Sequence, residues 1–489
     1  MTAHISITVA HGAVRSDGCP TYRLGQRTGD RDGIFAEWEW DGARLVANTD
    51  RYGLYPIYYY ATDSTVAVSS SVARLLELGA PRDLDDAAVA VFLSLGFFLG
   101  EATAFRSIHS LPPGARLEWA PGVCRVSATG LTIPKEQRLS RSSAIDGYIE
   151  LFREAIRRRP AEGRDCLTLS GGRDSRHILL ELCRAGRPPA LALTSELYPP
   201  ATLDDVELAR RIAGVTNVRH VVVPAPRRRW IAESQKNRMT SWCTDEHTWL
   251  LNAAAVAARE ATTLYDGIGG DVLSAGLFLQ KIPLTLIRHS VEAFAEQVTP
   301  HYGVRDFVAP HVRRRFSIEK AHEQVAAEAA RHVQAPNPVG SFYFWNRTRR
   351  EIALSPYALF AGVPTVYSPY IDHALFDHLT SLPAEFFLDH TFHDDTIRRA
   401  YPRYAEIPFQ NKEAPVRLDP TFGRRSAWQL GRWLQRSAQR DAIDVTRLGW
   451  ITAKRFIDGR HTSLDYVEPC KCIWLSEVLA LEQGGPSAT

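Results

Sequence analysis

The sequence predicts an α/β protein built from two unlike parts. Short runs rich in β-branched and aromatic residues, separated by turn signals, fill the first part. Strand-like and helix-like segments alternate in the second part, which is typical of a parallel sheet covered by helices. We therefore expect an N-terminal domain at 1–128, a linker at 129–143 and a larger domain at 144–489.

The N-terminal domain is expected to consist mainly of strands. The runs 44–48 and 56–60 are short, rich in Tyr, Val and Ile, and flank a turn at 50–53. The run 65–69 continues this pattern. The acidic pair at 85–86 is of the type that caps a helix, so a helix is expected to start there. A polar stretch with a proline then marks the linker.

The second domain is expected to open with a helix, because Ile145, Tyr148, Phe152 and Ile156 recur at helical spacing. After it, strand and helix signals alternate, and from about residue 275 the chain is mostly helical. Ligands of such parallel sheets bind at the carboxyl ends of the strands. Strands are expected at 166–169, 190–194 and 219–223, with helices running up to about Gly186 and over 204–213.

Composition narrows the classes of function. The 489 residues are 45% hydrophobic, and 58 Lys and Arg against 55 Asp and Glu give a net charge of +3. This balance lacks the strongly basic character of nucleic-acid-binding proteins. The longest apolar run, at 87–100, is shorter than the roughly 20 residues that span a bilayer. With no secretory signal at its start, we expect a cytoplasmic protein with no nucleic-acid or membrane partner.

The seven cysteines do not indicate a disulfide framework, because their number is odd and their spacing scattered. Cys470 and Cys472 have the spacing of half a metal clamp. No second Cys or His pair at ligand spacing follows them, so we expect two thiols on one strand or turn instead.

The loop at 170–175, Ser-Gly-Gly-Arg-Asp-Ser, lies between the first predicted strand of the sheet and a helix. Gly171 and Gly172 would let backbone amides approach an anion, and the helix start adds unpaired N–H groups. The hydroxyls of Ser170 and Ser175 can donate to phosphate. Asp174 would repel phosphate unless a cation such as Mg²⁺ lay between them. No Lys-Ser/Thr pair closes the loop, so it is not a Walker loop.

The residues 169–175 resemble the pyrophosphate loop of the N-type ATP pyrophosphatases, a superfamily that includes asparagine synthetase, GMP synthetase and NAD synthetase. The resemblance implies an adenine nucleotide alpha hydrolase-like domain that cleaves ATP between its α and β phosphates. A carboxylate becomes an acyl-adenylate, and an amine then attacks it.

Further segments resemble the asparagine synthetase family in the same order. They include 50–59, 105–114, the glycine-rich turn at 266–271, 367–372, and Asn411 with Lys412. This resemblance implies a glutaminase-like αββα sandwich in the N-terminal domain. It also implies an ATP site formed by Leu169, Ser170, Gly171, Gly172, Asp174, Ser175, Thr194, Gly267, Gly269 and Gly270.

Three residues are expected to carry the chemistry. Asp174 and Asp271 would share the Mg²⁺ ions that bridge the phosphates. Lys412 would place a positive charge near the α-phosphate or the developing oxyanion. All three are inferred from their positions in the family's motifs.

The chain departs from the family at several positions. Thr2 stands where glutamine-hydrolysing members have a catalytic Cys, so we expect no glutaminase activity. Arg176 replaces a small hydroxyl residue, Val272 an acidic residue, and Thr365 a Glu found in many relatives. The β-lactam synthetases deprotonate the amine with a Tyr–Glu pair. Here that pair is not assigned, and its candidates are Tyr343, Tyr357 and Glu351.

These departures favour the amide-forming branches of the family, in which the substrate supplies its own amine. Peptide macrolactam formation, as in lasso-peptide cyclases of natural-product biosynthesis, is the leading hypothesis, with a peptide or small-molecule substrate. A protease or leader-binding protein is then a candidate partner. A β-lactam synthetase or intermolecular amide ligase is the close alternative, and a catalytically inactive nucleotide-binding scaffold is another. A tRNA-modifying relative gains no support from charge or cysteine spacing.

Overall fold

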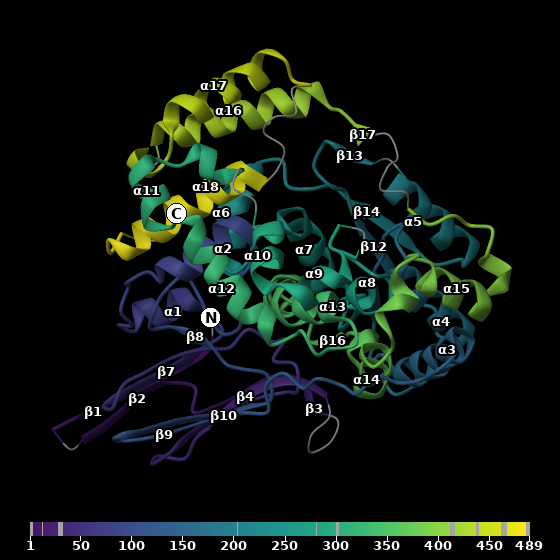
Figure 1. Ribbon diagram of the computed structural model, residues 1–489, viewed down its shortest axis with the longest axis horizontal. Helices are drawn as coiled ribbons and strands as arrows, with labels where there is room; N and C mark the ends of the chain where they lie inside the picture. The colour runs from purple at the N-terminus through teal and green to yellow at the C-terminus, as the bar shows by residue number, and fades with distance from the viewer. Residues whose placement is uncertain are drawn as a thin grey trace.

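The computed structural model describes most of the chain and places its two parts side by side (Figure 1). Strands of the N-terminal part form two sheets at the bottom of the view, and the C-terminal helices lie at the top. The described residues are 3–11, 13–27, 33–202, 204–279, 281–299, 303–410, 416–436, 440–460 and 467–485.

The N-terminal part is a sandwich of two antiparallel sheets. Their orders are β2-β1-β7-β6-β8 and β10-β9-β5-β4-β3. Alternating residues of the facing strands, such as Ile7, Trp38, Val66 and Trp119, point between the sheets and are fully buried. The strands are β1 (His4–Ala10), β2 (Ala13–Gly18), β3 (Thr21–Arg27), β4 (Gly33–Trp40), β5 (Leu45–Thr49), β6 (Tyr58–Ala61), β7 (Thr65–Ser69), β8 (His109–Ser110), β9 (Ala115–Ala120) and β10 (Val123–Ala128).

The sandwich is covered by helices on one side. Helices α1 (Val72–Glu77) and α2 (Asp86–Leu95) form a buried cluster with residues of β6 and β7, and Asp85 caps α2 as predicted. The outer face of the other sheet carries exposed charges instead, among them the ion pair of Arg23 and Glu37 at 2.8 Å. The predicted αββα arrangement is therefore wrong for the described residues, which form three layers. A face of paired charges has no apolar area for a helix to bury.

The second part is built on a parallel sheet, as predicted. Its order is β14-β12-β11-β15-β16, and every neighbouring pair is parallel. The chain adds strands on one side of β11 and later on the other, so the order reverses between β11 and β15. Such a switch point leaves a crevice at the carboxyl ends of the two strands. The strands are β11 (Asp165–Thr168), β12 (Leu191–Ser195), β14 (His220–Val223), β15 (Thr263–Tyr265) and β16 (Thr365–Tyr367).

Helices cover this sheet and continue its core. In α3 (Arg141–Arg157), the four apolar residues that predicted the helix are buried. The helix begins inside the stretch expected to be linker, because Ser140 accepts from Ser143 N at 3.1 Å and caps it there. Helices α4 (Asp174–Arg184) and α5 (Asp204–Val215) follow β11 and β12, and α7 (Leu251–Glu260) precedes β15.

The rest of the chain is mostly helical, as expected. A short ribbon pairs β13 (Ala201–Thr202) with β17 (Val416–Arg417). The helices are α6 (Arg229–Met239), α8 (Gly270–Ser274), α9 (Leu284–His289), α10 (Val291–Val298), α11 (Pro310–Arg315), α12 (Ile318–Ala330), α13 (Pro338–Tyr343), α14 (His373–Thr380), α15 (Phe392–Ala400), α16 (Pro420–Arg436), α17 (Val445–Ile457) and α18 (Val467–Glu482), with π-helical turns at η3 (Phe344–Ile352) and η4 (Ser355–Leu359).

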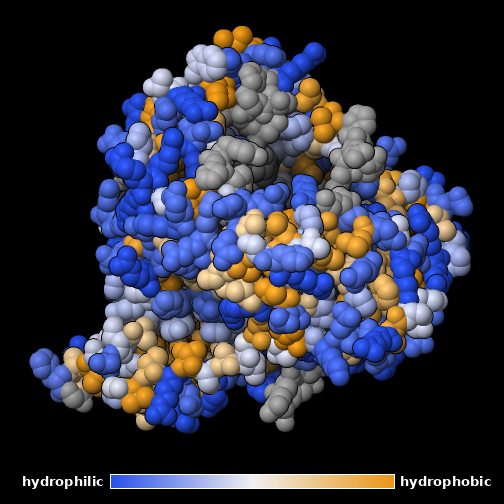
Figure 2. Space-filling model, in the orientation of Figure 1, coloured by the Kyte–Doolittle hydropathy of each residue, from blue (hydrophilic) through white to orange (hydrophobic). Residues whose placement is uncertain are grey.

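The C-terminal helices differ in burial. Cys470 and Cys472 are buried on α18, so the expectation of a strand or turn was wrong. Residues two apart on a helix point in different directions, which does not suit a shared metal. Trp428 on α16 and Trp450 on α17 are at least half exposed, and Figure 2 shows apolar atoms among charged ones at that end of the molecule. In the described residues, no helix is long and apolar enough to span a membrane.

Candidate active site

A cleft opens at the switch point of the parallel sheet. It has a volume of about 350 Å³, which is in the range of small-molecule sites. The loop after β11 contributes Ser170 and Asp174, and the end of β12 contributes Thr194. Gly267, from the turn after β15, and Gln410 line it from other sides. The structure thus brings together, in one cleft, residues that are up to 240 positions apart in the sequence.

The serines of the 170–175 loop hold the loop in shape. The Ser175 hydroxyl accepts from Ser170 N at 3.0 Å, and the Ser170 hydroxyl accepts from Gly172 N at 3.2 Å. Gly171 N donates to Asp205 at 2.8 Å. The glycine amides expected to face an anion therefore have partners within the protein. A Cβ on Gly171 would lie 3.0 Å from the backbone of Asp205, so this glycine is needed for close packing against α5.

Two arginines anchor the same loop. Arg173 forms an ion pair with Asp394 of α15 and donates to its two oxygens from Nε and Nη2. Arg176 is buried and donates to the carbonyls of Ile407, Pro408 and Gly171 at 2.8–3.1 Å. Burial lowers the pKa of Arg176 to about 10, so it keeps its charge at neutral pH. Arg176, which departs from the family pattern, thus ties the loop to the 407–408 segment and is not aimed into the cleft.

Asp174 is the first residue of α4, where a carboxylate is stabilised by the helix dipole. The glycine-rich turn packs directly on it. A Cβ on Gly267 would lie 2.9 Å from Asp174 Cβ, and a Cβ on Gly270 would lie 2.5 Å from its carboxyl carbon. Gly269 has a φ of +88°, which favours glycine. The two loops therefore meet because the turn has no side chains at these positions.

Asp266 fixes the start of this turn. Its carboxylate accepts from Thr168 Oγ1 at 2.8 Å and from Ile268 N at 2.9 Å. Burial raises the pKa of Asp266 above its ordinary value. The side chain thus joins the ends of β11 and β15 and sets the position of the glycines that follow.

The remaining expected site residues have different surroundings. Asp271 accepts from Val272 N at 2.7 Å at the start of α8, and it is not among the residues that line the cleft. Thr194 is buried, with its hydroxyl between Leu169 O and His220 Nε2, each at 2.7 Å. Lys412 lies outside the described residues. Sharing of Mg²⁺ by Asp174 and Asp271 stays a prediction.

An acidic cluster, formed by Asp245, Glu246 and Glu351, lies outside the residues that line the cleft. Oxygen atoms of Asp245, Glu246 and Glu351 lie within 4.8 Å of one another. Arg347, on the same π-helical turn as Glu351, contacts Glu351 at 3.1 Å and Glu246 at 3.3 Å. The turn η3, which carries Arg347 and Glu351, packs against α8, the helix that contains Asp271. Burial, and then the charge of Glu246, raise the pKa of Glu351 well above its ordinary value.

The two candidate tyrosines do not pair with Glu351. Tyr357 is buried with its hydroxyl 2.7 Å from Ser368 Oγ. Tyr343 stacks on Phe278, with ring centroids 3.7 Å apart. Among the described residues, no hydrogen bond joins either tyrosine to Glu351, so a Tyr–Glu pair is not formed in this structure.

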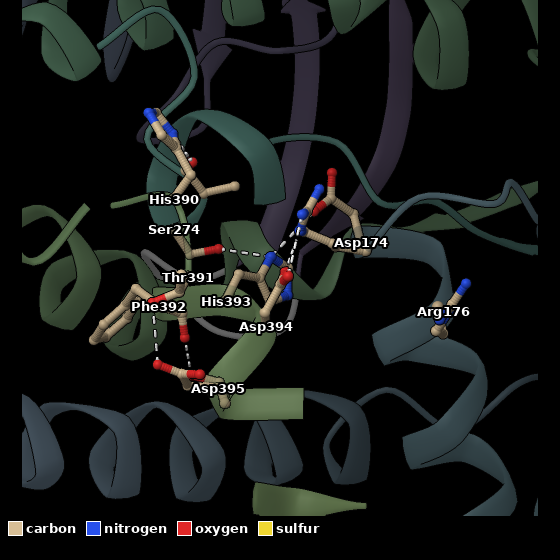
Figure 3. Close-up of polar contacts among 12 residues, drawn as sticks. Asp174, Arg176, Ser274, His390, Thr391, Phe392, His393, Asp394 and Asp395 are labelled. Carbon is tan, nitrogen blue, oxygen red and sulfur yellow. Dashed lines mark hydrogen bonds and ion pairs between the residues drawn. The ribbon is translucent and has the colours of Figure 1, made fainter. Parts of the chain in front are cut away.

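Sequence reasoning missed a buried polar cluster behind Asp174. Figure 3 shows His393 of α15 between Asp174 and Ser274. His393 Nδ1 lies 3.4 Å from Asp174 Oδ1 and 3.1 Å from Ser274 Oγ. Burial lowers the pKa of His393 to about 3, so the ring is neutral at pH 7. The run His-Asp-Asp at 393–395, three polar residues in one helical turn, was the available signal.

The comparisons with known proteins bear on the N-terminal part. Residues 23–128 match the model of the glutamine amidotransferase domain family. The search of curated proteins found no match. Solved structures that match at low identity include a glutamine phosphoribosylpyrophosphate amidotransferase from B. subtilis complexed with ADP and GMP, and an allosteric regulatory enzyme of purine biosynthesis.

These structural matches are partial. The B. subtilis enzyme is 12% identical and the match covers 60% of each chain, while the second is 13% identical and covers 55% of this chain and 59% of that one. Both TM-scores are 0.15, which is too low for these superpositions to indicate a shared overall fold. The chain thus spans about 60% of the length of these proteins, and its amidotransferase-like domain rests on the family match and the two-sheet sandwich.

The amidotransferase-like domain is attached to the second part by buried contacts. Arg349 and Arg350 of η3 donate to the carbonyls of Gly100, Ala102 and Leu111. Arg51 of the sandwich also pairs with Asp377 of α14. The domain therefore holds in place the same π-helical turn that presents Arg347 and Glu351.

Proposed function

We propose that this protein uses ATP to activate a carboxylate as an acyl-adenylate and joins it to an amine, with release of AMP and pyrophosphate. One observation carries this proposal. The 170–175 loop and the glycine-rich turn meet on Asp174 at the switch point of a parallel sheet, the place where such sheets bind ligands. An amidotransferase-like domain beside that sheet is consistent with amide-bond chemistry in general.

The cleft suits a magnesium-bound nucleotide. Asp174 offers a carboxylate at a helix N-terminus, and the absence of side chains at Gly267 and Gly270 leaves space next to it. Mg²⁺ bound there would neutralise phosphate charge during cleavage. We propose Asp174 and Asp271 as its ligands and Lys412 as the cation near the α-phosphate. Ser170 and Ser175, which now bond each other at 3.1 Å, would turn their hydroxyls to the phosphates.

The acidic cluster is proposed to receive the amine. The carboxylates of Asp245, Glu246 and Glu351 outnumber the two cations that contact them, Arg347 and Lys471, and would attract an ammonium group. Burial raises the pKa of Glu351 above its ordinary value, which makes its carboxylate a stronger base than an exposed one. Glu351 is thus the proposed general base, and it acts without a tyrosine partner.

The substrate is proposed to be a peptide whose own amine closes a macrolactam. The acidic cluster would attract the charged amine of such a substrate. The β-lactam alternative is less supported, because the structure does not form the Tyr–Glu pair that this branch uses. An intermolecular amide ligase would use the same residues.

Nucleotide product analysis tests the proposal. The protein is incubated with Mg-ATP and pools of amino-acid, β-amino-acid and core-peptide carboxylates, and AMP is resolved from ADP. AMP formation with one pool, lost in Asp174→Ala, would support adenylation and would identify the branch. ADP formation would overturn it. ATP binding without turnover of any pool would favour an inactive scaffold.

A further inference from the structure

Asp174 is supported from behind by a chain of buried aromatic and polar groups. His393 and His177 are both fully buried, and their rings are joined by a contact of 3.2 Å between His177 Nδ1 and His393 Nε2. Tyr148 and Tyr370 place their hydroxyls 3.2 and 3.3 Å from the same His393 Nε2. The His393 ring is therefore fixed on one side by three groups, with its other nitrogen facing Asp174.

The hydrogen-bond partners assign the protons. Among the described residues, His177 Nε2 has no hydrogen-bond partner, and a buried N–H without a partner is costly, so the His177 proton is on Nδ1. It donates to His393 Nε2, which must then be unprotonated. The single proton of the neutral His393 ring is consequently on Nδ1, which lies 3.1 Å from Ser274 Oγ and 3.4 Å from Asp174 Oδ1.

Ser274 Oγ is the nearer of the two acceptors of the His393 Nδ1 proton. Its hydroxyl donates to Gly270 O at 2.7 Å, within the helical turn that begins the glycine-rich segment. Tyr370 in turn donates to the backbone carbonyl of Asp174 at 3.1 Å. The same cluster thus holds the main chain of Asp174, the side chain of Asp174 and the turn that packs on it.

We propose that His393 is a positioning residue, whose Nδ1–H is shared by Ser274 Oγ and Asp174 Oδ1 and so orients the Asp174 carboxylate toward the magnesium ion of the bound nucleotide. The inference rests on the proposed function, because it assigns Asp174 a metal. Histidines and carboxylates behind a metal ligand typically fix its orientation, and their removal weakens metal binding about 10–100-fold.

A matched pair of amide variants tests this geometry. In His393→Asn the amide nitrogen takes the place of Nδ1, whereas in His393→Gln it takes the place of Nε2 and faces the tyrosines. His390→Asn is the control, since His390 bonds Ala275 O at 3.0 Å outside the cluster, and Asn tolerates its φ of +57°. Nucleotide binding is titrated with Mg²⁺ at fixed ATP, with an EDTA-treated sample as reference.

We expect His393→Gln to raise the half-saturating Mg²⁺ concentration about tenfold, with metal-free ATP binding unchanged. His393→Asn and His390→Asn should stay within about twofold of the wild type by the same reasoning. Equal shifts in the Asn and Gln variants would indicate a general packing role and overturn the inference, as would no shift in either. Wild type that binds no Mg-ATP would instead overturn the proposed function.

A second measurement reads the proton position in the wild-type protein itself. Nitrogen-15 NMR of labelled histidines in the wild-type protein, with the His393 signal assigned from His393→Asn, reports which ring nitrogen carries the proton. We expect the Nδ1–H tautomer for His393. An Nε2–H tautomer would point the proton away from Asp174 and overturn the inference.

Discussion

The substitution Gly270→Ala should impair catalysis while changing the free energy of unfolding only slightly. The new Cβ would lie 2.5 Å from both the carboxyl carbon and Oδ1 of Asp174, and 2.9 Å from its Cβ. Carbon contacts are comfortable only at about 3.5 Å or more, so the Asp174 side chain must move by about 1 Å. It can do so, because its side chain is 25% exposed on the cleft side.

The two effects have different sizes. Overpacking costs about 1–3 kcal/mol, and a side chain that can rotate away favours the lower end of that range. Replacing glycine in a helix restores about 0.4–1 kcal/mol through the unfolded chain, so the free energy of unfolding should change by less than about 1 kcal/mol. Displacing a catalytic group by about 1 Å can cost about 100-fold in rate.

The assay combines chemical denaturation with Mg-ATP binding and AMP formation. Gly214→Ala is the control, because a Cβ there meets no atom within 4 Å and the residue lies in α5, away from the cleft. That control should gain about 0.5–1 kcal/mol and keep full function. Wild-type binding and turnover in Gly270→Ala would refute the placement of Asp174 in the reaction.

Three further changes test the surroundings of the site. Burial raises the pKa of Asp50 from 3.8 to about 7, so the folded state holds this proton more tightly than the unfolded state does. The free energy of unfolding should therefore fall as pH rises through that range. Urea unfolding should show this decline in the wild type and a smaller one in Asp50→Asn. Glu351→Gln should keep the substrate-dependent exchange of pyrophosphate into ATP, which reports adenylation, but should lose the amide product. Amide formation at the wild-type rate would exclude Glu351 as the base. Arg51→Met removes the ion pair with Asp377, in which the two side chains are 30% and 54% exposed. The free energy of unfolding should fall by at most about 1 kcal/mol, with turnover unchanged. A larger fall would show that the pair couples the two domains.

The alternation of strands and helices was predictable because it is a local property. The spacing of Ile145, Tyr148 and Phe152 is enough to predict their helix, and the apolar runs at 166–169 and 190–194 are enough to predict their strands. The position of the 170–175 loop at the carboxyl end of a strand follows from that order. The order of strands and helices along the chain was therefore enough to predict where the cleft lies.

The contacts across the cleft were not predictable, because they join distant segments. Arg173 is paired with Asp394, 221 positions later, and no local pattern indicates that partner. His393 reaches Asp174 only because α15 packs on α3. The resemblance to the family also implied a helical layer on the outer face of β3 and β4. That face carries charged side chains and gives a helix no apolar surface to pack on, so the prediction was wrong there.

The most direct test of the account follows an oxygen atom. Adenylation transfers one oxygen of the substrate carboxylate to AMP when the amide forms. With the active substrate labelled with oxygen-18 in its carboxylate, mass spectrometry should find one labelled oxygen in the AMP produced. Unlabelled AMP, or labelled inorganic phosphate together with ADP, would contradict adenylation as the activating step.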